Sequence, residues 1–181
     1  YSSSNGGASF NDATFNFNSG TITCSTDIQL DDENGGNVTS FVMGDGAPTL
    51  NLTDTNPFDD LPSTGVETIT LSGAGATVNY SRGGDQTIRA TTYTNLTCSN
   101  SGIKSAAGTL DINNDLLISG TGRLDANGND ITIGGDWTNS STYAPATGSF
   151  DQETRTVSFD GTGDQIITNT NTETFYNLTV N

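Results

Sequence analysis

Apolar residues recur every seven positions through the middle of the chain, at Leu110, Leu117, Leu124 and Ile131. In a sequence rich in Leu, Lys and Glu this spacing would indicate a coiled coil. Here the residues between them are largely Asn, Asp, Gly and Thr, which are weak helix formers, and the glycines would break a helix. The pattern therefore predicts short β-strands separated by Asn and Gly corners.

Three strands follow directly from this pattern: Leu110–Ile112, Leu116–Ile118 and Ile131–Ile133. Three sides of about seven residues make one circuit of about 21 residues, which we call a rung. The predicted fold is all-β, a parallel β-solenoid (β-helix) of short strands. A two-sheet β-sandwich with strand exchange between subunits is the alternative, because sandwich strands also recur every ~8–12 residues.

The first half of the chain has a similar alternation of apolar and polar residues. Residues 1–26 are expected to form two or three short strands. This segment is either a degenerate copy of a later repeat or the source of a strand that could be donated to a neighbouring molecule. Further strands are expected at Val38–Met43, Leu50–Thr53 and Val66–Leu71. Residues 54–65 contain two prolines and three acids, so they are expected to form an inserted loop and not a central strand.

An internal repeat organises the second half. The segments TVNYSRGGDQTI (77–88) and YTNLTCS (93–99) return as TVSFDGTGDQII (156–167) and FYNLTVN (175–181). Repeats usually bury their apolar faces by stacking on one another, and a unit of about 80 residues would hold roughly four rungs. We expect N-terminal strands in 1–26, a first repeat module in 27–99 that includes the 54–65 loop, and a second module in 100–181.

Composition and charge limit the classes of partner that the protein could bind. The chain is 31% hydrophobic and has a net charge of −16, with 5 Lys plus Arg against 21 Asp plus Glu. Nucleic acid is an unsuitable partner, because phosphate backbones require basic residues. No run approaches the ~20 apolar residues that span a bilayer. The sequence begins at Tyr1 and not at Met, which we interpret as a removed signal peptide, and so we expect an extracellular or cell-surface location.

The segments GGDWTN (134–139), TVSFDGTGDQII and FYNLTVN resemble the tandem repeats of large secreted bacterial surface proteins of the haemagglutinin-like or adhesin-like kind. The resemblance covers roughly residues 77–181. It implies a β-helical or stacked-β surface protein and indicates no catalytic residue.

Two cysteines occupy equivalent positions in strand-like segments, Cys24 in ITCST and Cys98 in LTCSN. Each lies two residues after an apolar residue and so shares its face of the strand. Two inward cysteines could form a disulfide in an oxidising compartment. The alternative is two buried free thiols.

Two further kinds of site are suggested by Asn and Asp residues. A calcium site at a corner could use Asp125, Asn127, Asn129 and Asp136, whose spacing partly follows a calcium loop. The alternative is a set of turns in which these side chains bond their own backbone. Glycosylation sequons occur at Asn37, Asn51, Asn79, Asn95, Asn139 and Asn177.

Catalysis is not expected. The chain has no His, which excludes Ser-His-Asp triads and His-based zinc sites, and no phosphate-binding loop motif. The repeated pairs Asp85-Gln86 and Asp164-Gln165 could suggest carboxylate catalysis, but their recurrence favours a structural corner role. Six aromatic residues could form either a sugar-binding stripe or core: Trp137, Tyr143, Phe150, Phe159, Phe175 and Tyr176. Core filling is favoured.

These observations predict a secreted structural subunit of an extracellular, pilus-like filament. A stack of strands leaves unpaired edges at its ends, and head-to-tail contact with other copies would cover them. The alternative is an adhesin or carbohydrate-binding module of a larger surface protein, with surface glycans as partners. No cofactor is expected to be required beyond the candidate calcium.

Overall fold

The computed structural model describes residues 13–28, 38–58, 66–144, 148–170 and 172–181. Within these residues the protein is all-β: it has no helix, and its strands form four sheets, named A to D here. Every strand pair described is parallel. None of these residues forms a helix that could cross a membrane.

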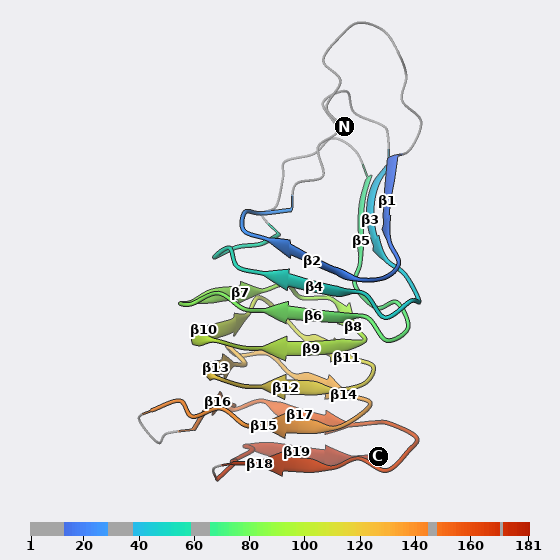
Figure 1. Ribbon diagram of the computed structural model, residues 1–181. Helices are drawn as coiled ribbons and strands as arrows, with labels where there is room; N and C mark the ends of the chain where they lie inside the picture. Colours follow the sequence, from blue (N-terminus) through green and yellow to red (C-terminus); the bar gives the residue numbers. More distant parts are fainter. Residues whose placement is uncertain (1–12, 29–37, 59–65, 145–147, 171) are drawn as a thin grey trace, which may run out of the picture.

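Sheet B runs almost the whole length of the molecule (Figure 1). Its strands, in the order in which they are paired, are β2 (Thr21–Cys24), β4 (Thr49–Leu52), β6 (Thr77–Tyr80), β9 (Asn95–Cys98), β12 (Leu116–Ile118), β15 (Trp137–Asn139) and β18 (Ile167–Asn169). This sheet therefore includes strands from all three segments that the sequence suggested as units.

The other three sheets complete the circuit. Sheet A contains β1 (Ala13–Phe17), β3 (Val38–Met43) and β5 (Val66–Thr70). Sheet C contains β8 (Thr92–Tyr93), β11 (Leu110–Ile112), β14 (Ile131–Ile133), β17 (Thr156–Phe159) and β19 (Asn177–Val180). Sheet D contains β7 (Gln86–Ile88), β10 (Ser101–Ala106), β13 (Thr121–Asp125) and β16 (Phe150–Asp151).

From β8 to β17 the chain visits sheets C, B and D in turn and then returns to C. Register pairs show how many residues each circuit takes: Val78 lies opposite Leu96, Leu96 opposite Leu116, and Leu116 opposite Trp137. The circuits in this part of the chain are thus close to the predicted 21 residues. All strand bounds predicted between 110 and 133 are confirmed.

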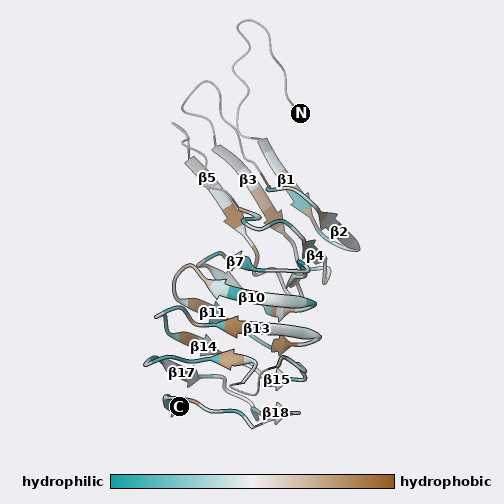
Figure 2. Ribbon diagram, turned by 90° about the vertical axis from the view of Figure 1, so that its left-hand side faces the viewer, coloured by the Kyte–Doolittle hydropathy of each residue, from teal (hydrophilic) through white to brown (hydrophobic). Residues whose placement is uncertain are grey.

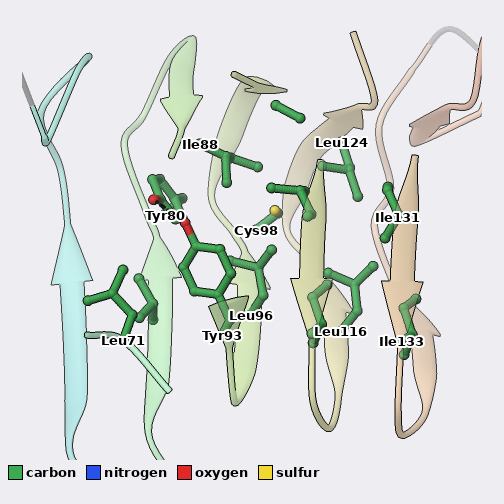
Figure 3. Close-up of a cluster of buried hydrophobic side chains, with 14 of the residues drawn as sticks. Leu71, Tyr80, Ile88, Tyr93, Leu96, Cys98, Leu116, Leu124, Ile131 and Ile133 are labelled. Carbon is green, nitrogen blue, oxygen red and sulfur yellow. Dashed lines mark hydrogen bonds between the residues drawn. The ribbon is translucent and has the colours of Figure 1, made fainter. Parts of the chain in front are cut away.

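The core lies between the sheets and follows the alternation within each strand. Residues at alternate positions are buried, as in β4, β6 and β9, because successive side chains of a strand point to opposite faces. Figure 3 shows Leu96, Cys98 and Leu116 among the side chains that fill this interior. Figure 2 shows hydrophobic segments in strands such as β11 and β14, with hydrophilic segments largely at the corners.

One of the four residues in the seven-residue spacing is not on the inner face of its strand. Leu117 faces outward between Leu116 and Ile118, which are both buried. The reason is that side-chain direction alternates with a period of two inside a strand, whereas the sides of a rung differ slightly in length. The spacing located the strands correctly but not every inward position.

The two repeat copies do not stack in the same phase. TVNY (77–80) forms β6 in sheet B, whereas its counterpart TVSF (156–159) forms β17 in sheet C. Between these strands the chain completes three rungs and two further sides, so the second copy is rotated by one side of the coil. One repeat unit thus comes close to the predicted roughly four rungs, but it does not end at a rung boundary.

Candidate functional site

The repeated Asp-Gln pair is a corner that fastens one rung to the previous one. The Gln86 side-chain amide donates to the carbonyls of Leu52 (2.9 Å) and Asp54 (2.8 Å), and its Oε1 accepts from the backbone N–H of Arg82. Gln86 is almost completely buried. These bonds satisfy the Asp54 carbonyl and the Arg82 N–H, whereas the Leu52 carbonyl also accepts from the Ser81 N–H.

The second copy reproduces this arrangement. Gln165 donates to the carbonyls of Ile133 (2.9 Å) and Gly135 (3.0 Å), and accepts from the N–H of Gly161. The two glutamines therefore make equivalent sets of three contacts, although Gln86 begins β7 and Gln165 lies in the connection between β17 and β18. The expected structural role is confirmed, but the partners are main-chain groups of the preceding rung and not other glutamines in a ladder.

Aspartate carboxylates also connect successive rungs, as acceptors. In each case an oxygen of a corner Asp accepts from a backbone N–H in the following rung, at 2.8–3.0 Å. The pairs are Asp45 with Ala74, Asp85 with Ile103, Asp115 with Asp136, Asp130 with Thr156, and Asp136 with Ile166. These contacts give the carboxylates a structural function. The absence of enzymatic activity stays a prediction.

The four residues of the candidate calcium site lie at two corners. Asp125 accepts from the N–H of Asn127 (2.8 Å), and the amides of Asn127 and Asn129 both donate to the Ala106 carbonyl. Asp136 lies at the next corner, beyond β14, where it accepts from the N–H of Ile166. The contacts are those of self-bonded turns. In the described part of the chain no three Asp, Glu or Cys side chains form a group that could hold a metal ion.

The six sequons differ in their surroundings. Asn37 lies outside the described residues. Asn139 is 5% exposed and donates to Glu173, so the folded chain leaves no room for a glycan on this residue. Asn177 is exposed on β19.

The other three sequon asparagines belong to hydrogen-bond networks on the outer face of sheet B. Asn79 donates to the Asn51 Oδ1 (3.0 Å) and accepts from Ser99. Asn95 donates to the Ala76 carbonyl and accepts from Asn114. A glycan on Asn79 or Asn95 would replace a proton of an amide that already donates a bond.

The predicted disulfide between Cys24 and Cys98 is wrong, because both are free thiols. Both face inward in sheet B, but register places them on one line through Leu52 and Tyr80, three strand steps apart. Three steps correspond to about 14 Å, whereas bonded cysteines have Cα atoms ~4.4–6.8 Å apart. Cys98 is buried, and burial raises the pKa of its thiol to about 12.

Lys104, the single lysine of the chain, has a structural role that the sequence analysis missed. Its side chain is buried, and Nζ donates to the carbonyls of Arg82 (2.8 Å), Gly84 (2.7 Å) and Ser101 (2.8 Å). Burial lowers the pKa of the ammonium group to about 8, while Cys98 and then Asp85 act in the opposite direction. The available signal was its even spacing from Ala106, which places both on the inner face of one strand.

Aromatic side chains fill the C-terminal part of the core. Trp137 and Phe150 are buried edge to face with centroids 4.8 Å apart, and Phe175 packs on both. The Glu173 carboxylate accepts from Trp137 Nε1 (3.1 Å) and from the Asn139 amide. Burial raises the pKa of Glu173, and these two bonds partly offset that effect.

The remaining aromatic candidates divide between core and surface. Phe159 is buried, so core filling is confirmed for this residue as for Trp137 and Phe150. Tyr143 is half-buried, with the Arg123 guanidinium 5.8 Å from its ring centroid. Tyr176 is exposed. A continuous surface stripe of these residues is therefore absent.

A polar cleft of about 410 Å³ lies beside β7. Its lining residues are Asn56, Pro57, Phe58, Thr87, Arg89, Ala90 and Ala107. The Thr87 hydroxyl donates to Asn56 (2.7 Å), and the Arg89 guanidinium lies 5.8 Å from the Phe58 ring centroid. The cleft thus combines an aromatic face, a cation and amide groups.

Comparison with family models, curated proteins and solved structures gives no match to this chain. The resemblance to haemagglutinin-like repeats therefore stays a prediction.

The two ends of the strand stack expose apolar side chains. Among the described residues, the large apolar side chains with high exposure are all at these ends: Phe15 on β1, and Ile166, Ile167, Tyr176, Leu178 and Val180 around β18 and β19. Figure 1 shows β18 and β19 at the opposite end of the stack from β1 and β2. Exposed apolar groups gathered in this way mark interaction surfaces more often than scattered ones do.

Proposed function

We propose that this protein is a secreted structural subunit of an extracellular filament, a parallel β-solenoid that assembles head to tail through its strand edges. The observation that carries the proposal is that the apolar residues exposed at the C-terminal end continue buried lines of the core. Val157 and Phe159 are buried in β17, and their register partners on β19 are Leu178 and Val180. Leu178 is 48% exposed and Val180 is 71% exposed.

These side chains face the interior direction of the coil and would be buried by one more strand. Covering them would remove apolar surface from water, which stabilises association by about 25 cal/mol per Å². The same strand would also satisfy the free backbone groups along the β19 edge. Both terms favour one more strand on β19, and in the proposed filament another copy of the protein supplies it.

A corner at the same end supports this view. Asp85 accepts from the N–H of Ile103 in the following rung. Its counterpart in the second copy, Asp164, is exposed. A following rung would supply the N–H group that this position bonds in the first copy.

The solenoid architecture is supported by the pairing pattern. Sandwich sheets are antiparallel, with strands joined by hairpins and Greek-key connections. Here all described pairs are parallel, and the chain passes through three sheets in a fixed order, which is the pattern of a coil. The extracellular location is supported by the surface-protein resemblance and by an exposed sequon at Asn177.

The proposal is tested by negative-stain electron microscopy and sedimentation of the purified chain across a concentration series. Salt of ~0.15 M should be present, because it shortens the range of repulsion between chains of charge −16. We expect filaments from the native chain and loss of filaments in Leu178→Asp. Thr179→Asp is the matched control, since Thr179 is the next residue of the same strand and points to the outer face.

A stable monomer at high concentration would refute the filament. A closed ring of defined size would also refute it, because unlike ends form rings when the rotation between subunits closes. Filaments that are equally lost in both variants would show that charge on β19, and not the buried line of Leu178, controls assembly.

The second candidate function is an adhesin or carbohydrate-binding module of a larger surface protein. It is favoured by the cleft of Asn56, Phe58, Thr87 and Arg89, because aromatic faces with neighbouring polar groups suit sugar rings. Binding to a glycan array that is lost in Phe58→Ala would support it. The absence of binding at millimolar glycan would refute it.

A further inference from the structure

We propose that the partner of β19 is β1 of a second copy, paired in parallel with Leu178 opposite Phe15 and Val180 opposite Phe17. This inference rests on the proposed filament and adds which strands meet and in which register.

Each of the two strands has one free side. β19 pairs with β17 and β1 pairs with β3, and within the described residues no strand pairs with their other sides. All pairs are parallel, with strands added in one direction through the sheet. Among the residues that the structure describes, β1 thus has no earlier neighbour and β19 no later one, and the backbone N–H and C=O groups on these two sides are complementary.

The two strands lie on one continuous line of register pairs, although the strands of sheet A run steeply along the stack where those of sheet C run across it (Figure 1). Sheet A meets sheet C where Leu71 bridges to Tyr93. Val42 pairs with Thr70, which places Met43 opposite Leu71. A strand at the outer edge of sheet A thus occupies the same side as a strand at the outer edge of sheet C.

Register along this side fixes which residues would meet. One inward line of side chains runs through the following residues in order: Phe17, Met43, Leu71, Tyr93, Ile112, Ile133, Phe159 and Val180. All are buried except Val180. Continuing this line from one copy to the next places Val180 beside Phe17.

The neighbouring inward line gives a second match. It passes from Phe15 to Phe41 at one end, and from Leu110 through Ile131 and Val157 to Leu178 at the other. Phe15 is 53% exposed and Leu178 is 48% exposed, whereas Phe41 and Val157 are buried. The exposed members at the two ends are both apolar, so pairing buries two apolar side chains against each other.

Cysteine cross-linking tests the register. In a Cys24→Ser background, Phe15→Cys chains are mixed with Leu178→Cys chains that carry a mass tag, and the mixture is mildly oxidised. Paired strands lie ~5 Å apart, within the range that a disulfide spans, and buried Cys98 does not compete. We expect a covalent heterodimer at least tenfold more abundant than with Thr179→Cys in place of Leu178→Cys. The double variant Phe15→Cys/Leu178→Cys should give a ladder of oligomers.

The outcomes separate this inference from the proposed function. Filaments without preferential cross-linking of positions 15 and 178 would overturn the register and leave the filament intact. Cross-linking of Leu178→Cys chains mainly with each other would show a tail-to-tail contact and overturn the inference. Monomers without cross-links would refute both.

Discussion

Replacing Gln86 by Ala should lower the free energy of unfolding by more than the loss of side-chain volume alone would. The substitution removes two short hydrogen bonds to the carbonyls of Leu52 and Asp54 and one acceptor for the N–H of Arg82. The Leu52 carbonyl still accepts from the Ser81 N–H, so most of the cost comes from the other two groups. With about 1 kcal/mol per bond and an added penalty for buried groups without partners, we expect a loss of about 2–3 kcal/mol.

The equivalent change at Gln165 provides a matched control. Gln165 makes the same three contacts, but it is only half-buried at the open end, where water can replace the lost bonds. The expected loss there is about 1 kcal/mol. Urea unfolding followed by circular dichroism and by the fluorescence of Trp137, the single tryptophan, measures both variants. Coincident curves from the two probes are needed, because stacked repeats can unfold in steps.

Gln86→Glu separates hydrogen bonding from side-chain volume. A carboxylate of the same shape would face two carbonyl oxygens in a buried site, so its folded-state pKa would be raised above the unfolded value. The variant should then be closest to the native protein below the unfolded pKa of about 4.3 and lose stability as the pH rises through the folded pKa. If Gln86→Ala lies within 0.5 kcal/mol of the native protein, or if both glutamines cost the same, the fastening role is refuted.

Two further predictions concern titratable groups. Burial raises the pKa of Glu173, so the contribution of this residue to stability should be present at low pH and decline as the pH rises through the folded pKa. The fluorescence emission of Trp137 should report this transition, because Glu173 accepts from Trp137 Nε1. The variant Glu173→Gln should remove the transition. A transition that persists in Glu173→Gln would assign it to another group. Alkylation of the unfolded, unreduced chain should label both Cys24 and Cys98, because both are free thiols. Under native conditions Cys98 should stay unlabelled. A disulfide detected by mass spectrometry would contradict the structure.

The sequence predicted the strands well because local alternation determines them. Leu110–Ile112, Leu116–Ile118 and Ile131–Ile133 have the observed bounds, since apolar residues at every second position and Asn or Gly corners are local signals. The phase of the repeats was not predictable in the same way. It depends on the length of every corner, and one circuit grows from Leu116–Trp137 to Trp137–Ile167 because residues 140–149 and 160–166 form longer connections than their counterparts in the previous circuit.

The cysteine prediction failed for a related reason. Alternation correctly indicated that Cys24 and Cys98 face inward. It could not indicate their separation, because that depends on how many strands lie between them in the sheet. Lys104 was missed because an isolated lysine is normally on the surface, and its three carbonyl partners come from corners that only the fold brings together.

The corner contacts explain why the two ends of the stack are not equivalent. Five corner aspartates accept from a backbone N–H of the rung that follows, and each repeat glutamine donates to carbonyls of the rung that precedes it. In both sets the donor lies in the later rung, so these bonds share one direction along the stack. At the C-terminal end this direction leaves an acceptor, Asp164, beside apolar Leu178 and Val180. A surface of this kind is complementary to an N-terminal rung edge and not to another copy of itself, which supports the proposed head-to-tail contact over a symmetric dimer.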